Sequence, residues 1–390
     1  MPDVPDPSDG YMPPPPSNGA EPYEAELPTG SQVVRISPHG SSFWTQTAQI
    51  ETITTDGATR SYFLKIAEGE EGRGIMSGEF ESMSLLFRII PDLVPKPVTW
   101  GTYRDMPQFH FFLCDFQNCP PIEDFTASIA RLHKASIPLS PGKFGFPVTT
   151  YQGPIAQDNS WCDTWEAFFR QGMVRMLQRE EDVHGPDPEL SVLCEQLYDK
   201  VIPRLLRPLT VLKSITPVLV HGDLWYGNVC TDNATGKLIV FDACVFWAHN
   251  EYEVGTWRAP RYRFGKSYIE AYQKHFAIAE PTKDHDDRNA LYSMSVTSTK
   301  SPYSIPLTKF AVAMTCIHLL LTGHRYASGE SMFDPIRKYE SRLISVCSAM
   351  DTMKYLIDKF PRGYEEWEKN YEISHQEAES GIGSADVALS

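Results

Sequence analysis

Positive charge is scarce in this sequence. Only 35 Lys and Arg residues stand against 50 Asp and Glu, which leaves a formal net charge of −15 over 390 residues. A protein whose main partner is nucleic acid needs a basic surface that neutralises phosphates, so this balance argues against that class of function. A local basic pocket for a nucleotide such as ATP remains compatible with the sequence.

Closely spaced cysteine pairs are also missing. None of the eight cysteines belongs to a Cys-x-x-Cys pair, so we expect no zinc site. Cysteines dispersed in this way are typical of reduced thiols in the cytosol.

Long apolar runs are a third absence. The longest run, near residues 310–321, is interrupted by Thr315 and His318 and is too short to cross a bilayer. The opening Met-Pro-Asp is not followed by a basic segment and an apolar run, so we expect no secretory signal. Together with the cysteine pattern, these absences predict a cytoplasmic protein without a membrane partner.

Both ends of the chain lack the apolar residues from which a core is built. Residues 1–30 are rich in Pro, Asp, Glu, Gly and Ser, and Pro13–Pro16 form a stiff extended piece. We predict a disordered tail over residues 1–30, with a polyproline ligand as the alternative. The small, polar and acidic stretch from about Ser374, residues 374–390, is predicted to be disordered as well.

Short β-branched and aromatic runs dominate residues 31–118. Strand-like runs fall near residues 33–36, 49–53, 62–66, 97–102 and 109–116. Asp56-Gly57, between the second and third runs, is a strong hairpin signal. One helix interrupts the strands: Phe80, Met83, Phe87 and Ile90 recur at helical spacing, and Pro91 is expected to end it.

Residues 119–373 are mainly helical in pattern. Trp161, Trp165, Phe168 and Phe169 fall on one face of an expected helix, and residues 217–241 form a short β-like interval. We therefore predict an α+β, two-lobed protein-kinase-like fold. An antiparallel-sheet N-lobe over residues 31–118 would bind the nucleotide, and a mainly helical C-lobe over residues 119–373 would carry catalysis and substrate binding.

The strongest chemical signal is the string His221-Gly222-Asp223-Leu224-Trp225-Tyr226-Gly227-Asn228. Its spacing, His-x-Asp-x-x-x-x-Asn, matches the catalytic loop of kinases. Phosphoryl transfer needs a carboxylate that orients and deprotonates the attacking hydroxyl, and oxygen ligands that hold Mg²⁺ on the phosphates. We predict Asp223 as the catalytic base, and Asn228 with Asp242, at the end of the next strand, as the metal ligands. An ordinary polar loop before a hairpin is the alternative.

Lys65 and Glu79 form the second candidate pair. Lys65 ends a β-branched run, as the phosphate-binding lysine of kinase lobes does, and Glu79 lies early on the expected helix. An ion pair between them would hold Lys65 on the α and β phosphates of ATP. A solvated surface pair is the alternative.

Two further segments are predicted to bind the nucleotide because of where they lie along the chain. The loop between the first two strand-like runs holds only one glycine, Gly40, followed by Ser41 and Ser42, whose hydroxyl and backbone N–H groups could cover phosphates. A plain hairpin turn is the alternative. Asp115, Phe116 and Gln117 would form the hinge between the lobes, where adenine usually bonds to the backbone.

Trp225 lies inside the catalytic string. A tryptophan usually packs in a core, but its position beside Asp223 also allows it to stack on a sugar, and the sequence leaves both roles open.

Taken together, these motifs resemble the fructosamine kinase family, which includes the ribulosamine 3-kinases, within the aminoglycoside-phosphotransferase-like superfamily. The string His221–Asn228 is similar to the family's His-Gly-Asp-Leu-Trp-x-Gly-Asn. The further matching segments are Asp242-Ala243, the stretch His249–Glu253, Gly78–Glu81, Leu132-His133, Lys143–Phe146, Gly153, the tryptophan-rich stretch Asn159–Phe169, and Tyr326 with Ser328.

The resemblance implies an ATP-dependent kinase that phosphorylates the sugar 3-hydroxyl of ketosamines, with ATP and Mg²⁺ as cofactors. Ketosamines are fructosyl or ribulosyl adducts of lysine, and the unstable phosphorylated adduct leaves, which repairs the protein. The partners would be glycated lysine side chains or free ketosamines.

Several positions depart from the family pattern and put the substrate in question. Ala243, Asn250 and Glu253 replace the family's Pro, Arg and Asp, and a polar stretch from Ser293 to Ser304 resembles an insertion. Two alternatives therefore stay open: a kinase for another hydroxylated amine, such as an aminoglycoside-like or choline-like compound, and a pseudokinase that only binds nucleotide.

Overall fold

The computed structural model describes residues 26–40, 45–117, 125–233, 235–259, 262–297 and 348–379. The chain divides into two compact units, one formed by Met1–Asp163 with Thr216–Ala277 and the other by Thr164–Ile215 with Ile278–Ser390. The predicted boundary between residues 118 and 119 falls outside the described residues. The division into an N-lobe and a C-lobe at that point stays a prediction.

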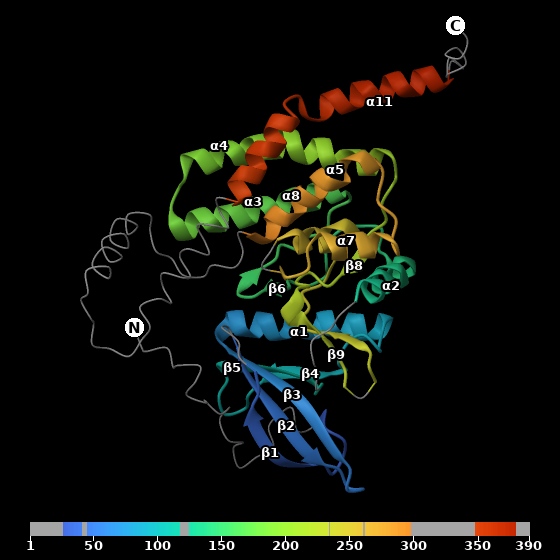
Figure 1. Cartoon of the computed structure of the whole chain (residues 1–390). Coiled ribbons are helices and arrows are strands. Elements are labelled where there is room, and N and C mark those ends of the chain that lie inside the picture. Colours follow the sequence, from blue (N-terminus) through green and yellow to red (C-terminus); the bar gives the residue numbers. More distant parts are fainter. Residues whose placement is uncertain are drawn as a thin grey trace, which may run out of the picture. The chain divides into compact units, whose positions relative to one another are not determined.

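The first unit contains a five-stranded sheet in the order β1-β2-β3-β5-β4, drawn in blue and cyan in Figure 1. Every neighbouring pair of strands is antiparallel. Its strands are β1 (Gln32–Pro38), β2 (Gln46–Ile53), β3 (Thr59–Glu68), β4 (Pro97–Thr102) and β5 (Phe109–Asp115). All five strands predicted from the sequence are therefore confirmed, and so is the antiparallel sheet.

The hairpin between β2 and β3 turns where the Asp56-Gly57 signal predicts. Thr54 and Ala58 close the turn through a backbone bond of 2.9 Å, and Gly57 adopts a φ of 82°. This left-handed conformation is nearly free of steric cost only for glycine. The hairpin fixes the register in which Lys65 of β3 lies opposite Thr47 of β2.

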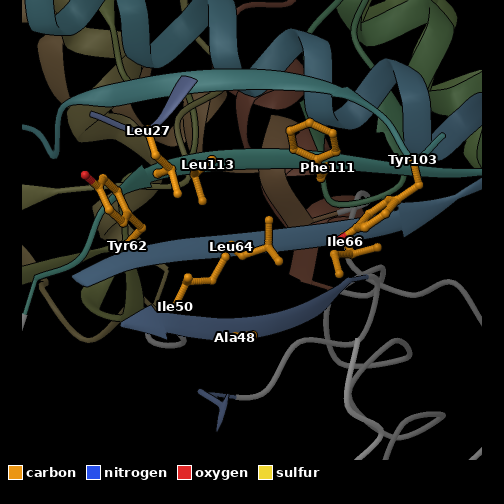
Figure 2. Packing of buried hydrophobic residues seen from close by; sticks show 9 residues of the cluster. All are labelled: Leu27, Ala48, Ile50, Tyr62, Leu64, Ile66, Tyr103, Phe111 and Leu113. Carbon is orange, nitrogen blue, oxygen red and sulfur yellow. The ribbon is translucent and has the colours of Figure 1, made fainter. Parts of the chain in front are cut away.

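Alternation along β3 sends neighbouring side chains to opposite faces of the sheet. Tyr62, Leu64 and Ile66 face one side, where they pack with Phe111 and Leu113 of β5 in a buried cluster (Figure 2). Lys65 therefore faces the other side, which is covered by α1 (Gly69–Ile89).

Helix α1 packs its apolar face on this second side of the sheet. Met76, Met83 and Leu86 are buried, and Phe80 contacts Phe112 of β5 edge-on. The helix ends at Ile89, before Pro91, as predicted, because the residue before a proline is disfavoured in the helical conformation. The packing holds the middle of α1, which carries Glu79, over Lys65. The prediction that Glu79 lies early on the helix was wrong, because α1 already begins at Gly69.

The rest of the described part of the first unit contains three short antiparallel strand pairs, three α-helices and the short 3-10 helices η2 (Ile137–Leu139), η4 (Tyr226–Asn228) and η5 (Thr256–Arg258). The pairs are β6 (Tyr151–Gln152) with β7 (Ile155–Ala156), β8 (Val218–Val220) with β11 (Phe246–Ala248), and β9 (Val229–Thr231) with β10 (Leu238–Val240). The α-helices are α2 (Thr126–Ser136), α6 (Asn250–Gly255) and α7 (Lys266–Gln273). The β-like interval predicted over residues 217–241 is thus confirmed.

The described part of the second unit is helical. It comprises α3 (Trp165–His184), α4 (Pro188–Gln196), a π-helical turn η3 (Leu197–Val201), α5 (Ile202–Val211), the short η7 (Thr282–Asp284), α8 (His285–Thr297), helical residues 348–359 and α11 (Gly363–Glu379).

Trp165 is fully buried, and its indole N–H donates to Tyr292 Oη at 2.8 Å. The prediction for Trp161 was wrong: it precedes the helix and is 43% exposed, because α3 begins at Trp165 with Thr164 as its N-cap.

Two other predictions need correction at the ends of elements. Leu27, placed in the N-terminal tail, is buried in the cluster of Figure 2. Helix α11 continues past Ser374 to Glu379, so the C-terminal tail cannot begin at residue 374. Residues 293–297 of the polar stretch belong to α8, and the interpretation of residues 293–304 as an insertion stays a prediction. Residues 1–25, 298–304 and 380–390, and Tyr326 with Ser328, lie outside the described residues.

Among the cysteines that the structure describes, Cys230 departs from the prediction. Cys230 is disulfide-bonded, whereas Cys114, Cys162, Cys194 and Cys244 are free thiols. The expectation of reduced cysteines was therefore wrong for Cys230. Among the residues that the structure describes, no helix is long and apolar enough to span a membrane.

Candidate active site

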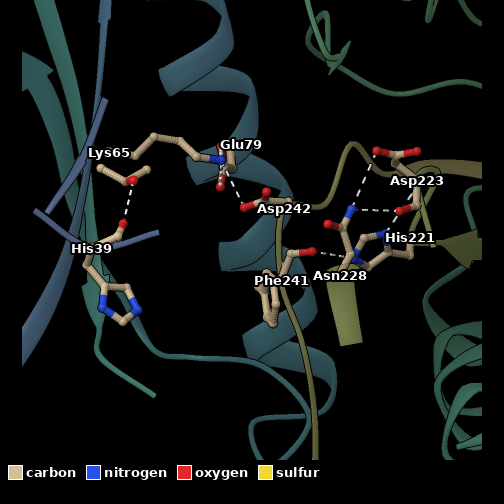
Figure 3. A network of polar contacts seen from close by, with 9 residues as sticks. His39, Lys65, Glu79, His221, Asp223, Asn228, Phe241 and Asp242 are labelled. Atoms are coloured by element: carbon tan, nitrogen blue, oxygen red, sulfur yellow. Dashed lines mark hydrogen bonds and ion pairs between the residues drawn. The ribbon is translucent and has the colours of Figure 1, made fainter. Parts of the chain in front are cut away.

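Lys65 and Glu79 form the predicted ion pair. Lys65 Nζ lies 2.7 and 2.9 Å from the two carboxylate oxygens of Glu79, and both side chains are buried (Figure 3). Strand β3 directs Lys65 toward α1, and Glu79 projects from the facing side of that helix. The surface-pair alternative is excluded by this burial.

Asp242 is the third member of this charged cluster. Its Oδ1 accepts a hydrogen bond of 2.8 Å from Lys65 Nζ, while 42% of its side chain is exposed. Asp242 has a φ of 60°, a left-handed conformation that is costly for most residues but tolerated by Asp. The preceding Phe241 is held in place, because its N–H donates to Asn228 O at 3.2 Å and its carbonyl accepts from His221 Nε2 at 2.9 Å.

The electrostatics of the cluster follow from one cation shared by two carboxylates. Burial alone would lower the pKa of Lys65, but Asp242 and Glu79 raise it well above its ordinary value. Burial raises the pKa of Glu79 to about 7, helped by the like charge of Asp242 and opposed by Lys65. The pKa of Asp242 is lowered, because the attraction of Lys65 outweighs the effect of burial.

Asp223 lies on the catalytic loop and is half-buried. Gln152 Nε2 donates to Asp223 Oδ1 at 3.0 Å, and Asn228 Nδ2 donates to the Asp223 carbonyl at 2.8 Å and to Oδ2 at 3.4 Å (Figure 3 shows the Asn228 bonds). The loop thus folds back on itself, so that Asn228 and Asp223 are neighbours, as their spacing predicts.

Asn228 and Asp242 offer the oxygens that a magnesium ion would need. Because Asn228 donates through Nδ2, its amide oxygen points away from Asp223, and Asp242 adds a partly exposed carboxylate. Mg²⁺ is usually held by one or two such oxygens together with substrate phosphates, so the donor set fits. No group of three His, Cys, Asp or Glu residues suited to a metal occurs in the described part of the chain.

Glu253 holds the backbone of the catalytic loop by hydrogen bonds, and its carboxylate is almost completely buried. It accepts the backbone N–H groups of His221 and Gly222, the latter at 3.3 Å. Gly222 has a φ of 87°, and a Cβ there would lie 2.4 Å from Cys244 O, so only glycine fits. From the sequence, Glu253 was noted only as a replacement of the family's Asp. In the structure, the Glu253 carboxylate still reaches both loop amides.

Trp225 is half-buried and packs over Gly227, where an added Cβ would fall 2.4 Å from its ring. Its indole therefore contributes to the packing of the loop. Stacking on a sugar remains a prediction.

The nucleotide loop is described only in part. His39 N–H donates to Thr47 O at 3.1 Å, which extends the β1–β2 hairpin, and Gly40 follows with a φ of 75°. Ser41 and Ser42 lie outside the described residues, so their role stays a prediction.

The hinge residues differ in what they can offer adenine. The N–H groups of Asp115 and Phe116 already donate to Lys96 O at 2.9 Å and Ser61 O at 3.0 Å. A hydrogen bond from either N–H to adenine would require that bond to break. Among the three predicted hinge N–H groups, Gln117 is the remaining candidate.

Gln152 is the neighbour of Asp223 that sequence reasoning missed. It lies on the short β6 strand, 71 positions before Asp223, and the sequence contains no local motif that marks it. Only the folded chain brings the two side chains together.

An antiparallel sheet that carries a buried Lys–Glu pair, followed by a loop with Asp223 and Asn228 and a strand that ends at Asp242, defines a phosphotransferase of the protein-kinase-like class. The sequence profile described as fructosamine kinase matches residues 42–297, and the chain belongs to this family. It is accordingly an ATP-dependent phosphotransferase.

Similar proteins agree with this assignment. The "probable ketoamine kinase" of Enterococcus faecium is 30% identical over 232 residues, which cover 58% of this chain and 76% of that protein. The chloroplastic protein-ribulosamine 3-kinase of Arabidopsis thaliana is 31% identical over 243 residues, or 60% of this chain and 68% of the relative. A crystal structure of a candidate fructosamine-3-kinase from Thermobifida fusca covers 75% of this chain and 95% of its own, with a TM-score of 0.55 and 20% identity, and supports the fold.

Proposed function

We propose that this enzyme transfers the γ-phosphoryl group of ATP to the sugar 3-hydroxyl of ketosamines, the ribulosyl or fructosyl adducts of lysine amines. The observation that carries the proposal is the arrangement of Asp223, Asn228 and Asp242 beside the Lys65–Glu79 pair within one unit of the chain. The named activities of the Enterococcus and Arabidopsis relatives support the ketosamine as acceptor.

In the proposed reaction, Asp223 orients the 3-hydroxyl and accepts its proton as the oxygen bonds to the γ-phosphorus of ATP. The bond between the γ-phosphorus and the β,γ-bridging oxygen breaks, and ADP leaves. Lys65, held by Glu79, binds the phosphates of ATP, while Asn228 and Asp242 would hold Mg²⁺. The ion would neutralise charge on the phosphates. Glu253 keeps the loop amides of His221 and Gly222 fixed, so that the base is presented in one geometry.

The biological consequence that we propose is the repair of glycated proteins, because a 3-phosphorylated ketosamine is unstable and leaves the lysine. Glycated lysine side chains and free ketosamines are both proposed substrates. A cytoplasmic location belongs to the same proposal.

The test is ADP release by the purified full-length protein with Mg²⁺ and ATP against ribulosyl-, erythrulosyl- and fructosyl-lysine. Choline and an aminoglycoside serve as comparison acceptors, and Asp223→Asn as the inactive control. We expect turnover with at least one ketosamine and a product phosphorylated at the 3-hydroxyl by ³¹P and ¹H NMR. Turnover only with choline or the aminoglycoside would favour the second kinase alternative, and turnover with none would favour a nucleotide-binding pseudokinase.

A further inference from the structure

Gln152 is a buried amide beside the candidate base. Only 9% of the residue is exposed, and its Nε2 lies 3.0 Å from Asp223 Oδ1. An ionised carboxylate only accepts hydrogen bonds, so the end of the Gln152 amide that faces Asp223 must be its NH₂ group. The carbonyl Oε1 of Gln152 is therefore the end of the amide that does not face Asp223.

None of the residues that the structure describes donates a hydrogen bond to that carbonyl oxygen. A buried amide normally satisfies both of its ends. An acceptor substrate whose hydroxyl lies on Asp223 would bring its neighbouring groups close to this oxygen. Gln152 Oε1 is thus placed to accept a hydrogen bond from the substrate.

The backbone next to Gln152 is fixed by packing against α1 and by a side-chain hydrogen bond. The segment Thr149–Tyr151 packs directly on α1: a Cβ at Gly78 would lie 2.8 Å from Thr149 O, and one at Gly74 would lie 2.3 Å from Tyr151 Oη. The fully buried Thr150 accepts from Asn159 Nδ2 at 2.8 Å. The Gln152 side chain is therefore presented from a fixed backbone that also rests on the helix bearing Glu79.

We propose that Gln152 is an acceptor-binding residue that recognises the amine of the ketosamine while it orients Asp223. This inference rests on the proposed function, since it assigns the substrate contact within the same site. In a ketosamine, three carbons separate the 3-hydroxyl oxygen from the amine nitrogen, so both groups can meet adjacent protein atoms. A protonated amine donates hydrogen bonds, and the amide carbonyl accepts one without adding negative charge beside Asp223.

A substrate that lacks the amine provides the direct test. The value of kcat/KM is measured for ribulosyl-lysine and for 1-deoxyribulose, which has the ketose but no amine, with wild type, Gln152→Met and Gln152→Glu. Met has a similar length but forms no comparable hydrogen bond. Gln178→Met is the matched control, because Gln178 Nε2 also donates to an aspartate, Asp182, at 3.1 Å on an exposed helix face.

For Gln152→Met, we expect the preference for ribulosyl-lysine over 1-deoxyribulose to fall by roughly tenfold or more, the size of a lost hydrogen bond to a charged group. Gln152→Met also removes the hydrogen bond that orients Asp223, which lowers kcat for both substrates. This effect cancels in the ratio of the two kcat/KM values. The KM for ATP should stay within about twofold of the wild type, since Gln152 is not placed at the nucleotide. The Gln178→Met control should leave all these values unchanged.

Gln152→Glu separates the two functions of the side chain and serves if the methionine variant fails to fold. Its carboxylate still accepts from the amine but cannot donate to Asp223 when ionised, so kcat should fall while the amine preference is kept or increased. Equal proportional losses for both substrates in Gln152→Met, or no loss, would overturn the inference alone. A wild type that phosphorylates no ketosamine would overturn the proposed function and this inference together.

Discussion

Lys65 Nζ lies 2.8 Å from Asp242 Oδ1, although 177 positions separate the two residues in the chain. The same ammonium group bonds both carboxylate oxygens of Glu79. One lysine therefore connects the strand β3, the helix α1 and the segment that carries the candidate metal ligand. The consequences of this connection can be measured.

Replacing Lys65 by methionine should weaken the use of ATP. The variant removes the cation that we assign to the phosphates and leaves the carboxylates of Glu79 and Asp242 facing each other. We expect kcat/KM for ATP to fall by roughly 10- to 100-fold, since hydrogen bonds to charged groups contribute about 1.5–3 kcal/mol. Lys143→Met, which removes an exposed ion pair with Asp163 at 3.0 Å, is the matched control and should change little.

Asp223→Asn should separate ATP binding from turnover. The amide keeps the shape of the side chain but cannot take up the proton of the attacking hydroxyl, and loss of a general base typically costs ~10²–10⁴-fold in rate. Calorimetry should show an ATP dissociation constant close to that of the wild type. Near-normal turnover would remove Asp223 from the role of base, and Asp182→Asn on the exposed face of α3 provides the control.

Asp242→Asn should weaken the effect of Mg²⁺ on ATP affinity, because a neutral amide oxygen replaces a charged carboxylate ligand. Asparagine is the better substitution than alanine here, because Asp242 has a φ of 60° and Asn tolerates this left-handed conformation. The measurement is ATP binding by calorimetry with and without Mg²⁺. A magnesium titration identical to that of the wild type would contradict the assignment of Asp242 as a ligand.

The raised pKa of Glu79, about 7, has a consequence for stability. Between pH 4.5, the ordinary value for this group, and pH 7, the unfolded chain loses the Glu79 proton while the folded protein keeps it. The folded state binds more protons in this window, so the contribution of Glu79 makes stability fall as the pH rises, by at most about 1.4 kcal/mol per pH unit.

Urea unfolding of wild type and Glu79→Gln at several pH values across this window measures that contribution. The wild type should lose stability relative to the variant as the pH rises toward 7, and the difference should level off above it. Parallel stability curves for the two proteins would show that Glu79 titrates at its ordinary pKa.

Trp225→Ala tests whether the indole contacts the acceptor. If Trp225 stacks on the sugar, the KM for the ketosamine should rise more than the KM for ATP, which is the signature of lost binding to one substrate. Trp225→Phe keeps an aromatic face and should restore part of the affinity. A lower melting temperature with equal effects on both constants would mean that the ring only packs over Gly227.

The local features of the fold could be predicted from the sequence because short-range physics sets them. The Asp56-Gly57 turn, the end of α1 before Pro91 and the five strands of the sheet all follow from residue preferences and spacing. The error at Trp161 has a related cause. Helical spacing continues backward past Thr164, but the capping bond of Thr164 to Ala167 N–H begins the helix at Trp165.

The candidate site was predictable where its residues are close in sequence or belong to a known pattern. Asp223 and Asn228 lie five positions apart, and Lys65 and Glu79 lie 14 apart on a strand and the helix that follows it. Gln152 was not predictable, because its relation to Asp223 depends on how the β6–β7 hairpin packs against Gly74 and Gly78 of α1. Long-range packing of that kind has no periodic signature.

By itself, the sequence determined the class of this enzyme. Residues close to one another in the chain set the spacing of the catalytic string, the Asp56-Gly57 turn and the alternation of side chains around Lys65. Tertiary structure alone decided which oxygens meet which donors. It placed Lys65 between the carboxylates of Glu79 and Asp242, and it brought the carboxylate of Glu253 to the loop amides. It also directed the amide of Gln152 toward Asp223. Hydrogen bonds act over about 3 Å, so they depend on the final approach of distant segments, which no local pattern encodes.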